Sequence, residues 1–207
     1  MFKITKEGYS VLVTFGILTI LAMFSHFKFL AYIFFILFLF SAYFFRDPER
    51  FPPRLENVIV SPADGRILKI EEIEDNYKIS IFMGLFDVHI NRAPISGKII
   101  EKKYQKGKFF NASLDKASEE NERMEYLIQT ENFTYKLSQI AGIIARRIVS
   151  YINSGDYVNI GEKIGMIKFG SRAEIVVPKK FVKVIVSEGQ KVYAGETIIG
   201  LINLGEG

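Results

Sequence analysis

Hydrophobic positions near the start of the chain form two almost continuous stretches. They are Tyr9–Phe24 and Phe29–Phe45, and the polar break Ser25-His26-Phe27-Lys28 separates them. A helix needs roughly 20 apolar residues to cross a bilayer, so each stretch is slightly short for a spanning helix. The pattern predicts a hairpin of two short membrane helices, with one long tilted or kinked helix as the alternative.

Basic residues lie on both sides of these stretches. Lys3 and Lys6 precede them, and Arg46, Arg50 and Arg54 follow them. Positively charged flanks stay in the cytoplasm, so both ends of the hairpin and the domain after it are expected on the cytoplasmic side of the cell membrane. A cleaved signal peptide does not fit, because the apolar region is too long and no small-residue cleavage site follows it.

After the hairpin the pattern changes to short apolar runs, each ended by Gly, Pro, Asn or Asp. Such runs, and the alternation of apolar and polar residues, are typical of strands. They include Val58–Val60, Ile79–Met83, Met124–Ile128, Phe133–Leu137 and Val182–Val186. We therefore expect an anchor at 1–45, a proline-punctuated linker at 46–57 and an all-β domain at 58–207. A weak helical signal is confined to 112–123.

Two sequence repeats occur inside the β domain. Residues 155–164 and 189–198 share the form G-x-x-V-x-x-G-E-x-I, and Pro62–Ile67 parallels Pro94–Ile99. Glycines at fixed positions suit tight turns that need a positive φ. The pattern resembles the hammerhead turns of biotinyl- and lipoyl-type barrel-sandwich folds, so we expect two related halves in one compact β domain.

Composition removes several classes of function. The chain has no cysteine, which excludes disulfides, thiolate catalysis and cysteine-based metal sites. Its two histidines, His26 and His89, are far apart in the sequence, so no metal site is expected. The net charge of +4 comes without a basic run that carries aromatic residues, so no nucleic-acid partner is expected. A mild positive charge beside a membrane segment favours an anionic lipid surface.

Three residues are candidates for proton-transfer chemistry. His89 is the only histidine after the hairpin, so any imidazole base of the domain must be this one. Asp64 lies in a turn before Gly65, and Ser171 lies between two predicted strands. Singly, each residue also fits an ordinary structural role in a turn or the core. Together they suit an Asp–His–Ser arrangement, in which the carboxylate orients the imidazole and the imidazole activates the hydroxyl.

The surroundings of Ser171 do not suit an ordinary hydrolase. The run Gly-Ser-Arg-Ala lacks the G-x-S-x-G form of a nucleophile elbow, and no strand–turn–helix pattern surrounds it. Attack on the chain's own backbone fits better, because Gly170 offers an unhindered carbonyl directly before the serine hydroxyl. The Gly170–Ser171 bond is therefore a candidate for self-cleavage.

Six stretches, spread in order over nearly the whole chain, carry a resemblance to a known family. They are Phe44–Arg50, Ser61–Gly65, Asp87–Pro94, Asn121–Arg123, Ala141–Ile148 and Gly165–Arg172. In these stretches the chain resembles the proenzymes of pyruvoyl-dependent phosphatidylserine decarboxylases, of the short membrane-anchored subtype. The resemblance implies a lyase of phospholipid biosynthesis that converts phosphatidylserine into phosphatidylethanolamine.

The resemblance also implies roles for the candidate residues. Ser171 attacks the Gly170 carbonyl and is converted into a pyruvoyl cofactor, which separates a large chain (1–170) from a small chain (171–207). Asp64 and His89 assist the cleavage, and His89 also serves decarboxylation. The pyruvoyl carbonyl then takes up the serine amine of the lipid and withdraws electrons as CO₂ leaves.

Four arginines match positions of the same family: Arg92, Arg123, Arg146 and Arg147. A guanidinium group suits paired contacts with a phosphate or a carboxylate, so these residues are candidates for substrate binding. A solvated surface charge is the alternative for each. Because Arg146 and Arg147 would face opposite sides of a strand, at most one of the two is expected to meet the substrate.

Three other functions remain open. An archaetidylserine decarboxylase would use the same chemistry on an ether lipid with the same headgroup. A non-catalytic, lipoyl-like membrane adaptor would keep the hammerhead turns without needing Asp64, His89 and the Gly170–Ser171 bond together. A serine hydrolase would stay as one chain. In the leading hypothesis the partners are the serine phospholipid, the membrane and the two chains of the proenzyme, and a homo-oligomer is left open.

Overall fold

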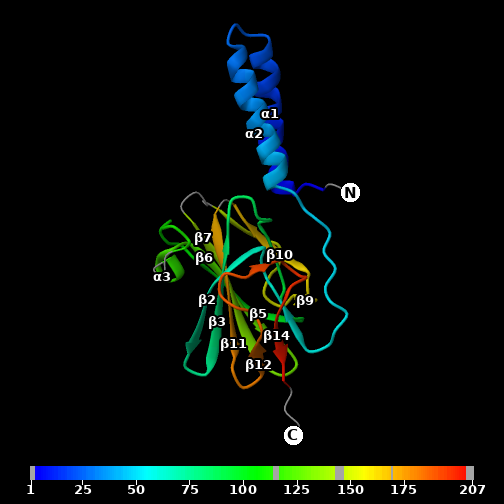
Figure 1. Ribbon diagram of the computed structural model, residues 1–207, viewed down its shortest axis with the longest axis vertical. Helices are drawn as coiled ribbons and strands as arrows, with labels where there is room; N and C mark the ends of the chain where they lie inside the picture. The colour runs from blue at the N-terminus through cyan, green and yellow to red at the C-terminus, as the bar shows by residue number, and fades with distance from the viewer. Residues whose placement is uncertain (1–2, 114–116, 143–146, 169, 204–207) are drawn as a thin grey trace. The chain divides into compact units, whose positions relative to one another are not determined.

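The structure, a computed structural model, describes residues 3–113, 117–142, 147–168 and 170–203. The chain forms two compact units, Met1–Glu49 and Arg50–Gly207. The first unit contains two helices, and the second contains all the described strands (Figure 1).

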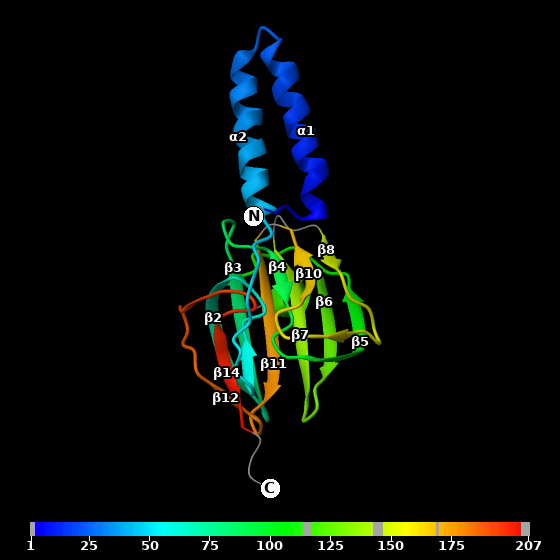
Figure 2. The same cartoon turned by 90° about the vertical axis from the view of Figure 1, so that its right-hand side faces the viewer.

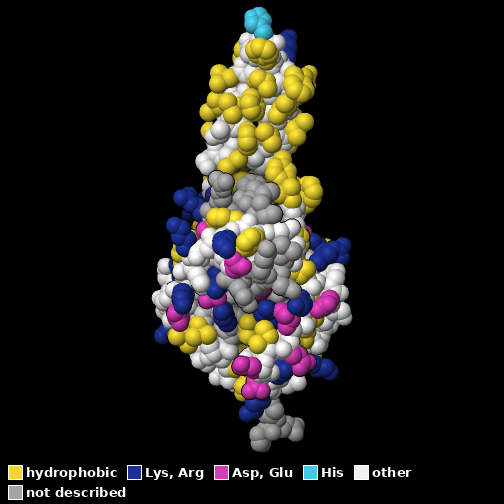
Figure 3. All heavy atoms as spheres, turned by 90° about the vertical axis from the view of Figure 1, so that its left-hand side faces the viewer, with side chains coloured by type: hydrophobic (Ala, Val, Ile, Leu, Met, Phe, Trp, Pro, Cys, Tyr) yellow, Lys and Arg dark blue, Asp and Glu magenta, His cyan; other side chains and the backbone are white. Residues whose placement is uncertain are grey.

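The first unit is the predicted helical hairpin. Helix α1 spans Lys6–Met23 and helix α2 spans Lys28–Phe44, so the polar break of the sequence separates two helices and the single long helix is wrong. Helix α1 is able to cross a membrane by its length and composition, and α2 is a shorter apolar helix. Apolar side chains, yellow in Figure 3, cover much of the hairpin surface. An exposed apolar surface of this kind marks a site of interaction.

The second unit confirms the all-β prediction with minor helix. Its strands are β1 (Val58–Val60), β2 (Gly65–Ile73), β3 (Asn76–Met83), β4 (Ile90–Arg92), β5 (Gly97–Gln105), β6 (Arg123–Gln129), β7 (Thr134–Ala141), β8 (Ile148–Ser150), β9 (Tyr157–Val158), β10 (Lys163–Ile167), β11 (Ser171–Pro178), β12 (Val182–Val184), β13 (Lys191–Val192) and β14 (Ile198–Ile202). The short helix α3 (Ala117–Glu120) lies inside the range where a weak helical signal was expected.

The described strands of the second unit form three sheets. The largest has the strand order β13-β2-β3-β11-β7-β6-β5-β9 and is strongly curled (Figure 2). Two smaller sheets have the orders β1-β14-β12 and β4-β10-β8. Ile59 of β1, Ile164 of β10 and Ile175 of β11 all belong to one hydrophobic core. The large sheet and the two small ones therefore fold around a single core.

Strand β11 lies near the centre of the large sheet. It pairs in antiparallel fashion with β3 on one side and with β7 on the other. Ala173, Ile175 and Val177 of this strand are fully buried, because alternate residues of a strand face the same side of the sheet. Ser171, the first residue of β11, is thus held between two neighbouring strands.

The two sequence repeats have the same turn geometry. Gly155 and Gly161 of the first repeat have φ angles of 94° and 78°, and Gly189 and Gly195 of the second have 80° and 76°. These left-handed angles strain any residue with a side chain. They confirm the prediction that the repeated glycines serve tight turns.

Matching hydrogen bonds show that the repeats fold as related halves. We call residues 61–67 with 189–198 half one, and residues 93–99 with 155–164 half two. In each half, an N–H of the first segment donates a hydrogen bond to a carbonyl of the second segment. An N–H of the second segment likewise donates to a carbonyl of the first. The bonds are Ile67 N to Gln190 O (2.9 Å) and Gly195 N to Ser61 O (2.8 Å) in half one, and Ile99 N to Asp156 O (2.8 Å) and Gly161 N to Ala93 O (2.8 Å) in half two.

Candidate active site

Ser171 combines deep burial with an unsatisfied hydroxyl. Its register places it beside Met83 of β3 and Ala141 of β7, and its exposed fraction is 0%. The hydroxyl has no hydrogen-bond partner among the described residues. An unsatisfied buried polar group costs roughly 1–3 kcal/mol, so it calls for an explanation in function. The preceding residue, Gly170, has a φ of +50°, in the left-handed region.

His89 is fully buried just before strand β4. Its Nδ1 atom lies 2.8 Å from the backbone carbonyl oxygen of Asp87. A carbonyl only accepts hydrogen bonds, so this contact favours the tautomer with a proton on Nδ1 and leaves Nε2 as the basic nitrogen. The carbonyl of His89 accepts a hydrogen bond of 3.2 Å from the N–H of Ile167, which ties the histidine to the strand that leads toward the Gly170–Ser171 bond.

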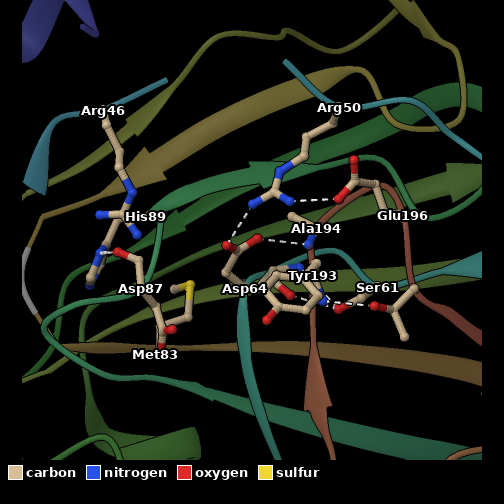
Figure 4. A network of polar contacts seen from close by, with 12 residues as sticks. Arg46, Arg50, Ser61, Asp64, Met83, Asp87, His89, Tyr193, Ala194 and Glu196 are labelled. Atoms are coloured by element: carbon tan, nitrogen blue, oxygen red, sulfur yellow. Dashed lines mark hydrogen bonds and ion pairs between the residues drawn. The ribbon is translucent and has the colours of Figure 1, made fainter. Parts of the chain in front are cut away.

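Asp64 has two firm partners, and neither is the imidazole. Its Oδ2 atom lies 2.8 Å from Nη2 of Arg50, and its Oδ1 atom accepts a hydrogen bond of 2.8 Å from the N–H of Ala194 (Figure 4). Arg50 also binds Glu196, with 2.6 Å between Nη1 and Oε2. The carboxylate is therefore held between a cation and a backbone donor.

The environment of Asp64 shifts the pKa of its carboxyl. Burial raises the pKa of this carboxyl above its usual value, although the Ala194 N–H and the Arg50 charge oppose that rise. The side chain is only 3% exposed. A buried carboxyl with a raised pKa and a specific cation partner is a frequent feature of functional sites.

A buried amide joins the segments that carry the three candidates. The Nδ2 atom of Asn91 lies 3.4 Å from the carbonyl oxygen of Pro62 and 3.5 Å from the sulfur of Met83. Its Oδ1 atom accepts a hydrogen bond of 2.8 Å from Nε2 of Gln139. Asn91 thus ties together the turn before Asp64, the residue paired with Ser171 and the strand that follows the histidine.

Of the four arginines predicted to bind substrate, Arg92 has a structural contact. It is 7% exposed, and its Nη1 atom donates a hydrogen bond of 2.8 Å to the carbonyl of Gly161. That carbonyl belongs to a tight turn of half two. The guanidinium therefore braces this turn.

The remaining predicted arginines differ in exposure. Arg123 is partly buried and forms an ion pair of 3.3 Å with Glu125. Arg147 is exposed. Arg146 lies outside the described residues, so the prediction that only one member of the pair 146 and 147 meets substrate stays a prediction.

Two charged residues near the site were missed by sequence reasoning. Arg50 was interpreted only as a basic flank of the hairpin, although it ends one of the stretches that carry the family resemblance. Arg172 is 2% exposed and forms an ion pair of 3.2 Å with Glu174, whose Oε1 also accepts a hydrogen bond from Ser80. This buried pair fixes β11 directly after Ser171.

Comparison with known proteins shows the family of this chain. Residues 37–200 match the family described as phosphatidylserine decarboxylase, which is most of the chain. The chain belongs to the phosphatidylserine decarboxylase family. This membership confirms the resemblance inferred from the six stretches and makes the protein a member of a decarboxylase enzyme family.

Individual members of the phosphatidylserine decarboxylase family are similar over most of the chain. The phosphatidylserine decarboxylase proenzyme of Carboxydothermus hydrogenoformans is 46% identical over 204 residues, which cover 95% of each chain. That of Syntrophus aciditrophicus is 44% identical over 206 residues, covering 95% of this chain and 96% of the relative. That of Azorhizobium caulinodans is 47% identical over 170 residues, covering 77% and 72%.

Proposed function

We propose that this chain is a phosphatidylserine decarboxylase that first cleaves its own Gly170–Ser171 bond and converts Ser171 into a pyruvoyl group. The observation that carries the proposal is the buried Ser171 hydroxyl, which has no hydrogen-bond partner among the described residues and directly follows the Gly170 carbonyl. Family membership supports the reaction class, and the word proenzyme in the relatives' names agrees with processing.

The first step is an acyl shift from nitrogen to oxygen. His89 Nε2 takes the proton from the Ser171 hydroxyl, and the oxygen forms a bond to the carbonyl carbon of Gly170. The proton then passes to the amide nitrogen as the carbon–nitrogen bond breaks. The product is an ester that joins Gly170 to the side chain of Ser171.

The second step breaks the chain. Loss of the Cα proton of residue 171 expels the ester oxygen, so Gly170 leaves as a carboxylate and residue 171 becomes dehydroalanine. Water then replaces the nitrogen of that residue, ammonia departs and an N-terminal pyruvoyl group remains. The products are a large chain, 1–170, and a small chain, 171–207.

Asp64 supports these steps through its charge. Because its oxygens bind Arg50 and the Ala194 N–H, we assign it a negative charge and no direct hydrogen bond to the imidazole. A negative charge in a buried site favours the imidazolium that forms when the histidine accepts the serine proton. Ala194 lies in the small chain and Asp64 in the large chain, so this contact also joins the two products.

The pyruvoyl group fits the site, because it forms from Ser171 where that residue is already held. The pairing of Ser171 with Met83 and Ala141, and the buried ion pair of Arg172 with Glu174, hold the start of β11 after the bond is cut. The pyruvoyl group supplies a carbonyl that binds the substrate amine and accepts the electrons released as CO₂ leaves.

The hairpin and the relatives favour a membrane lipid as substrate. The relatives' names specify phosphatidylserine, which favours the diacyl lipid over the ether lipid archaetidylserine. The apolar hairpin would hold the enzyme at the lipid surface, and its basic flanks favour the cytoplasmic side of the cell membrane. Arg123 and Arg147 are the proposed contacts for the lipid phosphate or carboxylate.

The intact mass of the purified protein tests the proposal. The wild-type protein is expected as two chains cut between residues 170 and 171, with a carbonyl reagent labelling only the small chain. Ser171→Ala should remain a single inactive chain, and His89→Ala should be cut far more slowly. A fully active wild-type protein found only as one uncut chain would overturn the proposal. Labelling of that uncut chain by a fluorophosphonate would identify a serine hydrolase instead.

A further inference from the structure

We propose that Gly142 is a positioning residue for the self-cleavage, because its lack of a side chain lets the Gly170 carbonyl lie against the end of strand β7. This inference rests on the proposed cleavage of the Gly170–Ser171 bond. Gly142 lies in a stretch that resembles the family, but the sequence alone assigned it no role.

The geometry leaves no room for a side chain at residue 142. A Cβ atom built there would lie 2.0 Å from the carbonyl oxygen of Gly170 and 3.0 Å from its carbonyl carbon. The obstacle is a backbone carbonyl, which is unable to rotate aside as a flexible side chain would. The φ of Gly142 is outside the left-handed region, so the need for glycine comes from the space taken by this carbonyl.

Strand register brings these two residues together. Ala141 of β7 pairs with Ser171 of β11, so the residues at 142 and 170 are neighbours at the ends of the two strands. The end of β7 is itself fixed, because the buried Asn121 side chain donates a hydrogen bond of 2.7 Å to the Ala141 carbonyl. The N–H of Ala141 also donates a hydrogen bond of 2.9 Å to the carbonyl of Glu122.

The contact involves the bond that reacts. The added Cβ would replace one Cα hydrogen of Gly142, so that hydrogen points toward the Gly170 oxygen as a weak Cα–H···O donor. When the Ser171 oxygen attacks, the Gly170 carbon becomes tetrahedral and its oxygen gains negative charge. Such an oxyanion needs both space and favourable neighbours in the transition state. A methyl group at 142 would displace the carbonyl from its position beside the hydroxyl.

Gly142→Ala tests the inference, with Gly97→Ala as the matched control. A Cβ at Gly97, in strand β5, would lie 2.6 Å from the backbone oxygen of Gln129, so this substitution creates a similar clash elsewhere in the same sheet. We expect Gly142→Ala to slow the appearance of the small chain by about tenfold or more, equal to about 1.4 kcal/mol in the barrier. Gly97→Ala should be cut at the wild-type rate.

Two further measurements separate positioning from lost stability. Thermal unfolding of both variants in a Ser171→Ala background, which stays uncut, compares their stabilities as precursors. Hydroxylamine, which cuts esters but leaves peptide bonds intact under mild conditions, reports whether the first step has occurred. We expect the Gly142→Ala precursor to fold. With Ser171 intact, we expect this precursor to resist hydroxylamine, because the ester does not form.

The outcomes distinguish this inference from the proposed function. An uncut wild-type protein would overturn the proposed function itself. A cut wild-type protein with unchanged cleavage in Gly142→Ala would overturn only the role of Gly142. Cleavage that slows equally in both variants, or a Gly142→Ala precursor that does not fold while Gly97→Ala does, would show a purely structural effect and overturn that role. Restored cleavage in the double variant Gly142→Ala with Ala112→Gly would also overturn the role of Gly142. The crowding would then come from the side chain of Ala112, whose Cβ lies 3.3 Å from a Cβ built at residue 142.

Discussion

The two halves of the β unit have matching backbone hydrogen bonds, but they differ in one side-chain acceptor. In half one, Oδ1 of Asp64 accepts a hydrogen bond of 2.8 Å from the N–H of Ala194. In half two the matching contact is made by Ser96, whose hydroxyl accepts a hydrogen bond of 2.8 Å from the N–H of Ile160. The turn therefore needs only an oxygen acceptor at this position. The negative charge of Asp64 exceeds that structural need, which is what a functional residue would show.

The charge in half one also has its own support. Asp64 is 3% exposed, and Arg50 bridges it to Glu196. In half two the matching Glu162 accepts a hydrogen bond of 2.8 Å from the N–H of Asn159, and it pairs with no arginine among the residues that the structure describes. A buried carboxylate without a partner is costly, so the arginine allows half one to carry a charge that half two lacks.

The largest effect on the rate of self-cleavage is expected when the acceptor of half one is replaced by the kind found in half two. Asp64→Ser gives half one the hydroxyl of half two, which reaches the same kind of N–H, so the protein should fold. Self-cleavage should slow by about 100-fold or more, because the charge that favours the imidazolium is gone. Intact mass measured over time after synthesis checks the rate.

Ser96→Ala is the matched control for this exchange, since it removes the acceptor of half two. It should lower stability by about 1 kcal/mol and leave the cleavage rate unchanged. Equal cleavage rates in Asp64→Ser and Ser96→Ala would show that the two halves do not differ in function.

Removing the arginine should change the pH dependence of cleavage. Arg50 opposes the rise in the pKa of Asp64, so Arg50→Met should raise that pKa further. Lys191 and Asp87 also act on this carboxyl, with opposite signs, and remain in the variant. In the proposed cleavage the carboxylate acts in its ionised form, so the loss of cleavage on acidification should begin at a higher pH in Arg50→Met. Arg50→Lys, which keeps the charge, should shift the profile less, and identical profiles in all three proteins would contradict the role of the arginine.

The charge of Asp64 should also lower the stability of the uncut precursor at neutral pH. Because its folded pKa is raised, the fold favours the protonated form, and this contribution to the free energy of unfolding is lost as the pH rises through the folded pKa. Asp64→Asn in a Ser171→Ala background should therefore unfold at a higher temperature than its parent at pH 7. That difference should shrink as the pH is lowered. A lower unfolding temperature at pH 7 would mean that the ion pair with Arg50 outweighs the cost of burial.

The smallest effect is expected from the two matching glutamates. Glu196 is about one-third exposed, and ion pairs of this kind contribute roughly 0.2–1 kcal/mol. Glu196→Gln should slow cleavage by up to about fivefold through a looser Arg50, whereas Glu162→Gln should leave the rate unchanged. Timed measurements of uncut and cut chain under one condition resolve this difference. A larger loss of cleavage rate in Glu162→Gln than in Glu196→Gln would contradict the expected difference between the halves.

Local patterns in the sequence were enough to predict most of the elements. Two apolar stretches with a polar break predicted the hairpin, because helix formation depends on neighbouring residues. Alternation and turn residues predicted strands such as β6 and β12, and repeated glycines predicted the paired turns. Scarcity of reactive side chains also selected Asp64, His89 and Ser171, since the chain offers no cysteine and no other histidine after the hairpin.

The tertiary structure alone decided how these residues are partnered. Sequence reasoning paired Asp64 with the imidazole, but the fold gives it Arg50 and the N–H of Ala194, which is 130 residues away. It also placed Gly142 against the Gly170 carbonyl. Such contacts depend on sheet order and register, which arise when distant strands pair around one core. A pattern of neighbouring residues holds no record of which distant backbone groups will meet, so only the assembled sheet determines them.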